Sequence, residues 1–306
     1  MTRAEAGRGA HGILLVDKPA GLTSAAVVAR VKRVLGGVKV GHLGTLDPFA
    51  TGLLPICLGE GTKLAPFVQD ATKRYVGEIV LGVETDTLDG TGAVVATHPV
   101  GALGPADLAR ARAALTGEIM QVPPMYSALK RQGVPLYRLA RKGQEVERAP
   151  RPVRITRFEL AVLARDRLAF AVTCSRGTYV RTLAQDLGRA LGTGAHLATL
   201  RRTASGPFEI ADAIALDAVE DAARAGTLSV LTPSAALAEL RAVVVDPPLE
   251  AAIRRGQQHA LGALAPPRAP RELVRLETGD GALVAVAEGV PGPGWRLARV
   301  LAPGAG

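Results

Sequence analysis

Two hydrophobic periods follow one another between residues 168 and 192, and they constrain the fold more than any other feature. Leu, Phe, Val and Cys occupy every second position over residues 168–174, which predicts a strand with one buried face. From Val180, apolar residues recur at offsets of 0, 3, 4, 7 and 11, which predicts an amphipathic helix that ends before Gly192. The fold must therefore pack a strand face and a helix stripe against a common core.

Other segments predict further elements of both kinds. Thr23 or Ser24 caps a helix that Gly36 and Gly37 close, and a short helix follows Pro105 and ends at Gly117. The remaining predictions are a buried strand over 75–83, a turn at Asp89-Gly90, and strands over 93–96, 273–276, 283–287 and 295–300. Because strands and helices mix without regular alternation, we predict an α+β fold with a small β-rich C-terminal part.

The composition indicates a globular protein of about two domains. The chain has 306 residues, of which 48% are apolar and 21% charged, and roughly 150 residues form one domain. No apolar run approaches the roughly 18–20 residues that cross a bilayer. The apolar stretch over residues 13–16 is too short to be the hydrophobic core of a signal peptide. Cys57 and Cys174 are too far apart for a disulfide framework or a clustered zinc site, so we expect both in the core. These features predict a soluble, cytoplasmic protein without a membrane contact.

Excess positive charge points to a class of partner. The chain carries 37 basic and 28 acidic residues, a net charge of +9, which favours a polyanion. Residues 129–157 hold nine basic and two acidic residues, and therefore +7 of this excess. Glycines and prolines interrupt the segment, and Tyr126 and Tyr137 accompany it, which predicts a partly irregular surface lobe. The lobe is either a solvated face or a contact with a nucleic-acid backbone.

Common catalytic motifs are absent from the sequence. It holds no G-x-x-x-x-G-K-[ST] phosphate loop, no G-x-S-x-G, no H-E-x-x-H and no C-x-x-C. One G-x-G-x-x-G, at Gly7, Gly9 and Gly12, has neither a strand before it nor a helix after it, so we interpret it as a chance match. The five histidines lie far apart and give no sign of a metal site. Nucleotide hydrolysis, common metal catalysis and nicotinamide chemistry therefore lose support.

A lone carboxylate stands in an unusual setting at Asp47. It lies among the glycines, prolines and apolar residues of the segment 41–55. One interpretation is that Asp47 caps a short helix whose first residue is Pro48. The other is a nucleophile or base in a dry pocket, approached closely by backbone that only glycine permits.

A cation at an unfavourable position supplies a second clue. Thr178 is the expected N-cap of the helix that starts near Val180, which places Arg181 in the first helical turn. A positive charge there faces the positive end of the helix dipole, at a cost of about 0.3–1 kcal/mol. Either a nearby anion offsets this cost or solvent screens it.

Taken together, the motifs resemble the tRNA pseudouridine synthase B (TruB) family over about residues 10–210. The matching segments are Asp17-Lys18-Pro19-Ala20-Gly21-Leu22-Thr23-Ser24, residues 41–55 with Gly44-Thr45-Leu46-Asp47-Pro48, residues 58–63, Lys73-Arg74-Tyr75, Thr85-Asp86-Thr87, residues 124–130, residues 174–183, Gly194-Ala195-His196 and Leu200-Arg201-Arg202. Each motif alone is short, but the ordered set is specific. The resemblance implies a pseudouridine synthase fold with a mixed, mostly antiparallel central sheet, flanking helices and a PUA-like C-terminal domain.

The resemblance also implies a reaction and its residues. A cofactor-independent isomerase would convert the T-loop uridine at tRNA position 55 into pseudouridine after flipping the base out of its stack. Asp47 would be the nucleophile, attacking C1′, adding to C6 or assisting glycal formation. Tyr75 would stack on the uracil and is a candidate base for the C5 proton, and Arg181 would pair with Asp47. The other substrate-binding residues would be His42, Tyr179 and Leu200.

Further expectations concern RNA contacts and organisation. The residues expected on the RNA backbone are Lys63, Lys130, Arg131, Arg138, Arg141, Lys142, Arg201 and Arg202. We expect a basic tail over 1–10, a catalytic domain over 11–235 that includes the lobe 129–157, and a PUA-like RNA-binding domain over 240–306. The partner would be the T-arm of tRNA, and the protein would act as a monomer. The alternative function is a non-catalytic RNA-binding protein or tRNA-folding chaperone on the same scaffold.

Overall fold

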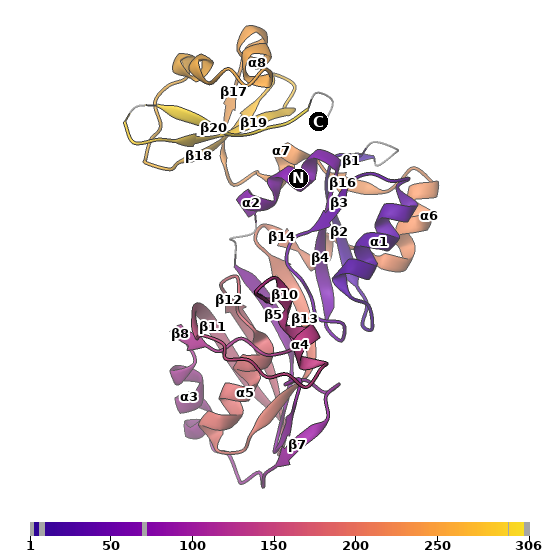
Figure 1. Ribbon diagram of the computed structural model, residues 1–306, viewed down its shortest axis with the longest axis vertical. Helices are drawn as coiled ribbons and strands as arrows, with labels where there is room; N and C mark the ends of the chain where they lie inside the picture. The colour runs from indigo at the N-terminus through magenta and orange to yellow at the C-terminus, as the bar shows by residue number, and fades with distance from the viewer. Residues whose placement is uncertain (1–2, 6–9, 69–71, 293, 303–306) are drawn as a thin grey trace. The chain divides into compact units, whose positions relative to one another are not determined.

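The computed structural model describes residues 3–5, 10–68, 72–292 and 294–302 (Figure 1). The chain divides into two compact units. Unit 1 comprises Met1–Pro48, Leu53–Asp70 and Pro207–Gly306, and unit 2 comprises Phe49–Gly52 and Ala71–Gly206.

The larger sheet of unit 1 has the strand order β1-β16-β2-β4. These strands are β1 (Arg3–Glu5), β16 (Ser229–Leu231), β2 (Gly12–Lys18) and β4 (Thr51–Leu58), which continues from unit 2. Strand β3 (Val40–His42) pairs antiparallel with β4, and β15 (Ile214–Ala215) pairs parallel with β2. Residues 3–5, expected within a basic tail, are thus part of a strand, whereas Gly7 and Gly9 lie outside the described residues.

Helix α1 (Ser24–Val34) covers part of this sheet. The Thr23 side chain accepts a hydrogen bond from the Ala26 N–H, which confirms the predicted cap and assigns it to Thr23. Val27 and Val31 are fully buried, and α1 packs against β3 and α6 (Val219–Arg224). Unit 1 also contains η1 (Gly59–Leu64), α2 (Ala65–Val68), β14 (Phe208–Glu209), η2 (Ile210–Asp212), η3 (Leu216–Ala218) and α7 (Pro233–Ala236).

The C-terminal part of unit 1 is a sheet in the order β17-β18-β19-β20, in which the last three strands correspond to those predicted over 273–276, 283–287 and 295–300. Its elements are β17 (Arg241–Val244), α8 (Pro247–Arg254), η4 (Gln258–Ala263), β18 (Leu273–Glu277), β19 (Leu283–Gly289) and β20 (Trp295–Val300). Val274, Leu276 and Trp295 lie in its core. Leu283 and Leu301 belong instead to the cluster that contains the N-terminal core residues of unit 1.

Unit 2 is built on a sheet in the order β4-β13-β5-β12-β11-β8. The strands that follow β4 are β13 (Ala195–Ser205), β5 (Lys73–Leu81), β12 (Arg167–Cys174), β11 (Arg151–Ala164) and β8 (Gly117–Gln121). Only the β4–β13 pair of this order is parallel among the described residues, so the predicted mixed, mostly antiparallel sheet is confirmed. A separate ribbon pairs β6 (Val83–Thr85) with β7 (Val94–Thr97).

The alternation over residues 168–174 and the helical period from Val180 form successive elements of unit 2. Every second residue of β12 is buried. Helix α5 (Val180–Leu191) buries its apolar stripe and packs against β13 and α3 (Pro105–Ala114). Gly192 ends α5 with a φ of 70°, a left-handed conformation that favours glycine. The N-cap is Tyr179 and not Thr178, because the Thr178 hydroxyl donates to the Ser175 carbonyl in the preceding turn.

The basic lobe is partly irregular, as predicted. It contains β9 (Lys130–Arg131), β10 (Val134–Pro135) and α4 (Leu136–Ala140), followed by residues 143–150 without regular structure. Buried Leu136 anchors it. The last three arginines of the basic segment lie instead on the long strand β11, because alternating residues there enter the core.

Both cysteines are free and buried, as expected. Burial raises the pKa of the Cys57 thiol to about 12 and that of Cys174 to about 11. None of the helices in the described ranges has the length and hydropathy needed to cross a membrane.

Candidate functional site

Asp47 lies half-buried in the connection between β3 and β4 of unit 1. This connection contains bends and residues without regular structure, and β4 begins at Thr51. The interpretation of Asp47 as a helix cap is therefore wrong, because the structure describes residues 43–50 and no helix starts at Pro48. The carboxylate stands in a loop, where its position depends on how the loop backbone is held.

The backbone is anchored on both sides of Asp47 by the segment that leads into α1. On one side, the Ser24 hydroxyl accepts from the Leu46 N–H at 2.9 Å and donates to the Leu46 carbonyl at 3.1 Å. On the other side, the Pro48 carbonyl accepts from the Gly21 N–H at 2.8 Å and from Lys18 Nζ at 3.2 Å. Three residues of the sequence motif 17–24, namely Lys18, Gly21 and Ser24, thus fix the loop 46–48.

Lys18 is a cation with no exposed surface, although lysine is almost never fully buried unless it is paired. Its Nζ donates to the carbonyls of Pro19 at 2.8 Å, Leu22 at 2.7 Å and Pro48 at 3.2 Å. These carbonyls replace the water that the ammonium loses on burial. Lys18 therefore ties the turn over residues 19–22 to the loop that contains Asp47 and Pro48.

Replacing Lys18 with methionine is expected to lower the free energy of unfolding by about 3 kcal/mol, because the three charge-assisted hydrogen bonds of Nζ to the Pro19, Leu22 and Pro48 carbonyls are lost. Urea unfolding followed by the fluorescence of Trp295, which also lies in unit 1, measures the loss. Lys32→Met, at an exposed position of α1, is the matched control and should change stability by less than about 0.5 kcal/mol. Equal stability of the two variants would contradict the role of Lys18.

Arg181 lies in the first turn of α5 in unit 2 and is only 4% exposed. Its Nη1 donates to the Thr87 carbonyl at 2.9 Å, and its Nη2 donates to the Tyr126 carbonyl at 2.8 Å. The Asp89 carboxylate lies 3.6 Å from Nη1 and is also buried. An anion therefore offsets the cost of a cation at this helix end, and solvent screening does not account for it.

Asp89 is a residue that sequence reasoning assigned only to a turn. Its Oδ1 accepts from the Thr87 hydroxyl at 2.8 Å and from the N–H and hydroxyl of Thr91. Because these bonds are all made to Oδ1, the other carboxylate oxygen, Oδ2, is the one that faces Arg181. The run T-D-T-L-D-G-T, which places threonines two residues on either side of Asp89, was the available signal.

Tyr75, Tyr179 and Leu200 also lie in unit 2. Tyr75 is 9% exposed on β5, and Leu200 is buried on the neighbouring strand β13. The backbone of Tyr179 is held by Gln121, whose side chain accepts from the Tyr179 N–H at 3.0 Å and donates to its carbonyl at 3.3 Å. Gln121, like Asp89, is a residue that sequence reasoning missed, since its partner is 58 positions away.

His42 and Lys63 belong to unit 1. His42 ends β3 half-buried, and the bulky Leu43 beside it is accommodated in the core. Lys63 Nζ forms an ion pair with Glu60 at 2.7 Å and donates to the Val300 carbonyl at 3.3 Å. Burial alone would raise the pKa of Glu60, but hydrogen bonds from Lys63 and the Ala302 N–H bring it below its usual value.

The residues expected on the RNA backbone differ in exposure. The five in the lobe are exposed, namely Lys130, Arg131, Arg138, Arg141 and Lys142. Arg201 is half-buried, whereas Arg202 is 1% exposed inside unit 2. The burial of Arg202 differs from the exposure expected for a phosphate contact, because β13 places it on the core side of the sheet between Tyr75 and Gly52. Gly52 has a φ of 100°, and a Cβ there would lie 2.3 Å from the Arg202 carbonyl oxygen.

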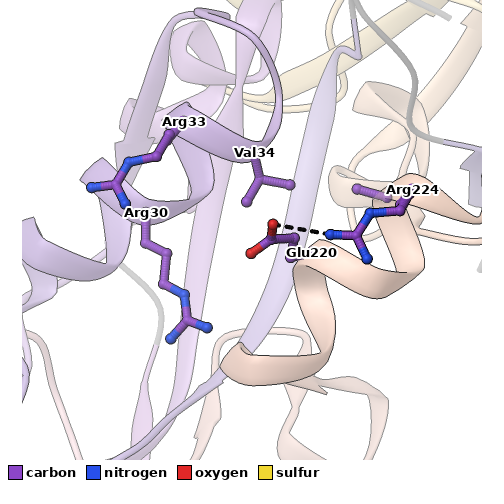
Figure 2. Close-up of a pocket in the computed structure, with 6 residues that line it drawn as sticks. Arg30, Arg33, Val34, Glu220 and Arg224 are labelled. Atoms are coloured by element: carbon purple, nitrogen blue, oxygen red, sulfur yellow. Dashed lines mark hydrogen bonds and ion pairs between the residues drawn. The ribbon is translucent and has the colours of Figure 1, made fainter.

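A pocket of about 370 Å³ lies in unit 1 between α1 and α6. Figure 2 shows Arg30, Arg33 and Val34 on one side and Glu220 and Arg224 on the other. Arg30 pairs with Asp217 at 2.7 Å, and Arg224 pairs with Glu220 at 3.1 Å and with Asp221 at 3.0 Å. Because most of its positive charge is paired, we assign this pocket no RNA contact. No group of three or more potential metal ligands occurs within the described ranges.

Comparison with known proteins adds to this geometry. Two family models match the chain, the TruB family pseudouridylate synthase N-terminal domain over residues 32–180 and the tRNA pseudouridylate synthase B C-terminal domain over residues 181–254. A tRNA pseudouridine synthase B from Geobacter sulfurreducens is 46% identical over 292 residues, which cover 92% of this chain and 94% of that protein. One from Aromatoleum aromaticum is 54% identical over 226 residues, or 74% and 73% of the two chains.

A solved structure supports the fold. The chain matches one described as "Crystal Structure of a Cbf5-Nop10-Gar1 Complex" with a TM-score of 0.74 and 24% identity, covering 99% of this chain and 95% of that one. This likeness concerns the fold alone, and it agrees with the mixed sheet and the C-terminal β structure. The two family models and the long, strongly similar relatives show that the chain belongs to the TruB family of tRNA pseudouridine synthases.

Proposed function

We propose that this protein converts the uridine at position 55 of the tRNA T-loop into pseudouridine, with Asp47 as its nucleophile. The family supplies the reaction class, which is isomerisation of tRNA uridine. The observation that carries the residue assignment is the anchored Asp47 loop. A carboxylate whose flanking peptides are held by Ser24, Gly21 and Lys18 is preorganised to react, because its position is set before the substrate arrives.

The reaction breaks the N1–C1′ glycosidic bond of uridine, rotates the uracil and forms a C5–C1′ bond. The proton lost from C5 and the proton gained at N1 balance, so no redox partner, nucleotide or metal is required. We assign Asp47 to nucleophilic attack on the uridine, and Tyr75 to stacking on the uracil and to the C5 proton. Arg181 would stabilise the Asp47 carboxylate, and His42, Tyr179 and Leu200 would hold the substrate.

Access to the target requires base flipping, because stacking hides C1′ and C6 of the uridine. Extrusion costs a few kcal/mol, which stacking and phosphate contacts offset. The exposed cations of the lobe suit the phosphate contacts, and Tyr75 suits the stacking. We further propose that the protein acts in the cytoplasm, as a monomer, without a metal or cofactor.

The direct test is incubation of the protein with T-arm RNA, followed by chemical probing of pseudouridine, because the product has the same mass as uridine. Product at position 55 alone is the expected result. An RNA that binds but stays unmodified would favour the alternative function, a tRNA-folding chaperone. Product at other T-arm uridines would contradict the assigned position.

The lobe gives a prediction about binding. Arg138→Glu combined with Arg141→Glu should weaken T-arm RNA binding by about tenfold or more and reduce the salt dependence by roughly two charges. The rate in the bound complex should change much less. A filter-binding series over salt concentration, paired with single-turnover kinetics, measures both effects.

The charge-matched control is Arg110→Glu combined with Arg112→Glu. Both arginines are exposed on α3, outside the lobe. This control should lose less affinity than the lobe variant. Equal losses would mean that only the net charge matters, and a slower chemical step at unchanged affinity would place the lobe arginines elsewhere.

A further inference from the structure

Two neighbouring hydroxyls at the start of α1 have different partners. The Thr23 hydroxyl accepts from the Ala26 N–H at 3.0 Å, so it caps the helix within its own first turn. The Ser24 side chain is 2% exposed, and its hydroxyl forms hydrogen bonds with the backbone of Leu46, 22 positions along the chain. Helix formation therefore explains Thr23 and does not explain Ser24.

The Ser24 hydroxyl meets both backbone groups of a single residue. It accepts from the Leu46 N–H at 2.9 Å and donates to the Leu46 carbonyl at 3.1 Å. The two groups lie on either side of the Leu46 Cα, so rotation about either backbone bond breaks one of these contacts. The Leu46 side chain is also buried, which opposes sliding of the loop. One serine thus restrains the conformation of a whole residue.

This restraint acts directly on Asp47. The Leu46 carbonyl belongs to the peptide plane that carries the Asp47 N–H, and a peptide plane is rigid. Beyond Asp47, the Pro48 carbonyl is held by Gly21 and Lys18. The Asp47 Cα is therefore fixed from both sides, and the Ser24 contacts are the ones that set its N-terminal side.

We propose that Ser24 is a positioning residue for the pseudouridine-forming reaction, which holds the Asp47 carboxylate in its reactive position through Leu46. This inference rests on the proposed role of Asp47 as the nucleophile. Misplacement of a reacting group by about 1 Å can cost roughly 100-fold in rate. Ser24 would therefore act on the chemical step and not on RNA binding.

The experiment compares Ser24→Ala with Thr23→Ala in the full chain, using T-arm RNA at saturating protein in single turnover. We expect Ser24→Ala to slow the bound-state rate by about 10- to 100-fold and to leave the RNA dissociation constant within about twofold. Thr23→Ala loses a helix cap, so its Tm should fall by a few degrees, about 2–4 °C, at an unchanged rate. All assays are run well below the lowest Tm of the set.

A conservative variant, Ser24→Thr, tests whether the hydroxyl itself is required. Ser24→Thr keeps the hydroxyl and should recover most of the rate that Ser24→Ala loses, whereas a purely structural role predicts rate losses that follow Tm across all three variants. A folded Ser24→Ala with a rate within about twofold of wild type, or one that loses RNA affinity in place of rate, would overturn the inference.

Asp47→Asn is measured in the same assays, so that failure of the Ser24 inference can be distinguished from failure of the proposed role of Asp47. If Asp47→Asn is inactive and Ser24→Ala is fully active, only the Ser24 inference fails. If Asp47→Asn itself keeps the wild-type rate, the proposed nucleophile is wrong and the Ser24 inference fails with it.

Discussion

Replacement of Asp47 by asparagine is expected to reduce pseudouridine formation by at least about 10⁴-fold, the scale of loss seen when a nucleophile is removed. Asparagine has almost the same size and no charge, so the reacting group is lost while the loop can keep its shape. The anchors of that loop are made to the backbones of Leu46 and Pro48 and do not involve the substituted side chain. Single-turnover kinetics with chemical probing of T-arm RNA measure the loss.

Two controls separate chemistry from folding and binding. The Asp47→Asn protein should keep the wild-type Tm within a few degrees, and its affinity for T-arm RNA should change little because the lobe is untouched. Equal amounts of product from Asp47→Asn and wild type would exclude Asp47 as the nucleophile.

Replacement of Asp89 by alanine is expected to lower the free energy of unfolding by about 3–5 kcal/mol, because it removes the carboxylate that lies 3.6 Å from the buried Arg181 guanidinium. The Thr87 and Tyr126 carbonyls remain, but neither carries a full charge. Activity should fall as well, because Arg181 loses one of the groups that orient it. Urea unfolding is best followed by circular dichroism, since the only tryptophan of the chain, Trp295, lies in unit 1.

Asp221→Ala is the matched control for Asp89→Ala. It removes a carboxylate from a pair with Arg224 at 3.0 Å, but both side chains are more than two-thirds exposed. Exposed pairs contribute about 0–1 kcal/mol, so this variant should be nearly as stable as wild type. If Asp89→Ala were no less stable than Asp221→Ala, the buried pair would not stabilise unit 2.

The sequence predicted those elements whose cause is local. The alternation over 168–174 and the period from Val180 correspond to β12 and α5, and Thr23 caps α1 as expected. The cap of α5 was placed one residue early, because Thr178 has a typical capping side chain but uses it in the preceding turn. Local propensity gives the type of an element more reliably than its end.

The sequence predicted the residues of the candidate site but not the residues that contact them. The motifs identified Asp47, Tyr75 and Arg181, whose roles stay predictions until the variants are measured. They did not reveal Asp89 beside Arg181, because a carboxylate in a T-x-D-G run is more often a plain turn residue. They also placed Arg202 toward RNA, since the letters alone do not tell which side of a strand faces the core.

By itself, the sequence therefore determined the kinds of elements, the excess positive charge near the lobe and the family to which the chain belongs. Only the tertiary structure decided that Ser24 holds Leu46, that Lys18 ties Pro48 to two other carbonyls, and that Asp89 faces Arg181. The physical reason is the range of the interactions. Helix caps and hydrophobic periods act over a few residues, whereas the contacts Ser24–Leu46, Lys18–Pro48 and Asp89–Arg181 join positions 22, 30 and 92 residues apart and exist only after the chain has packed.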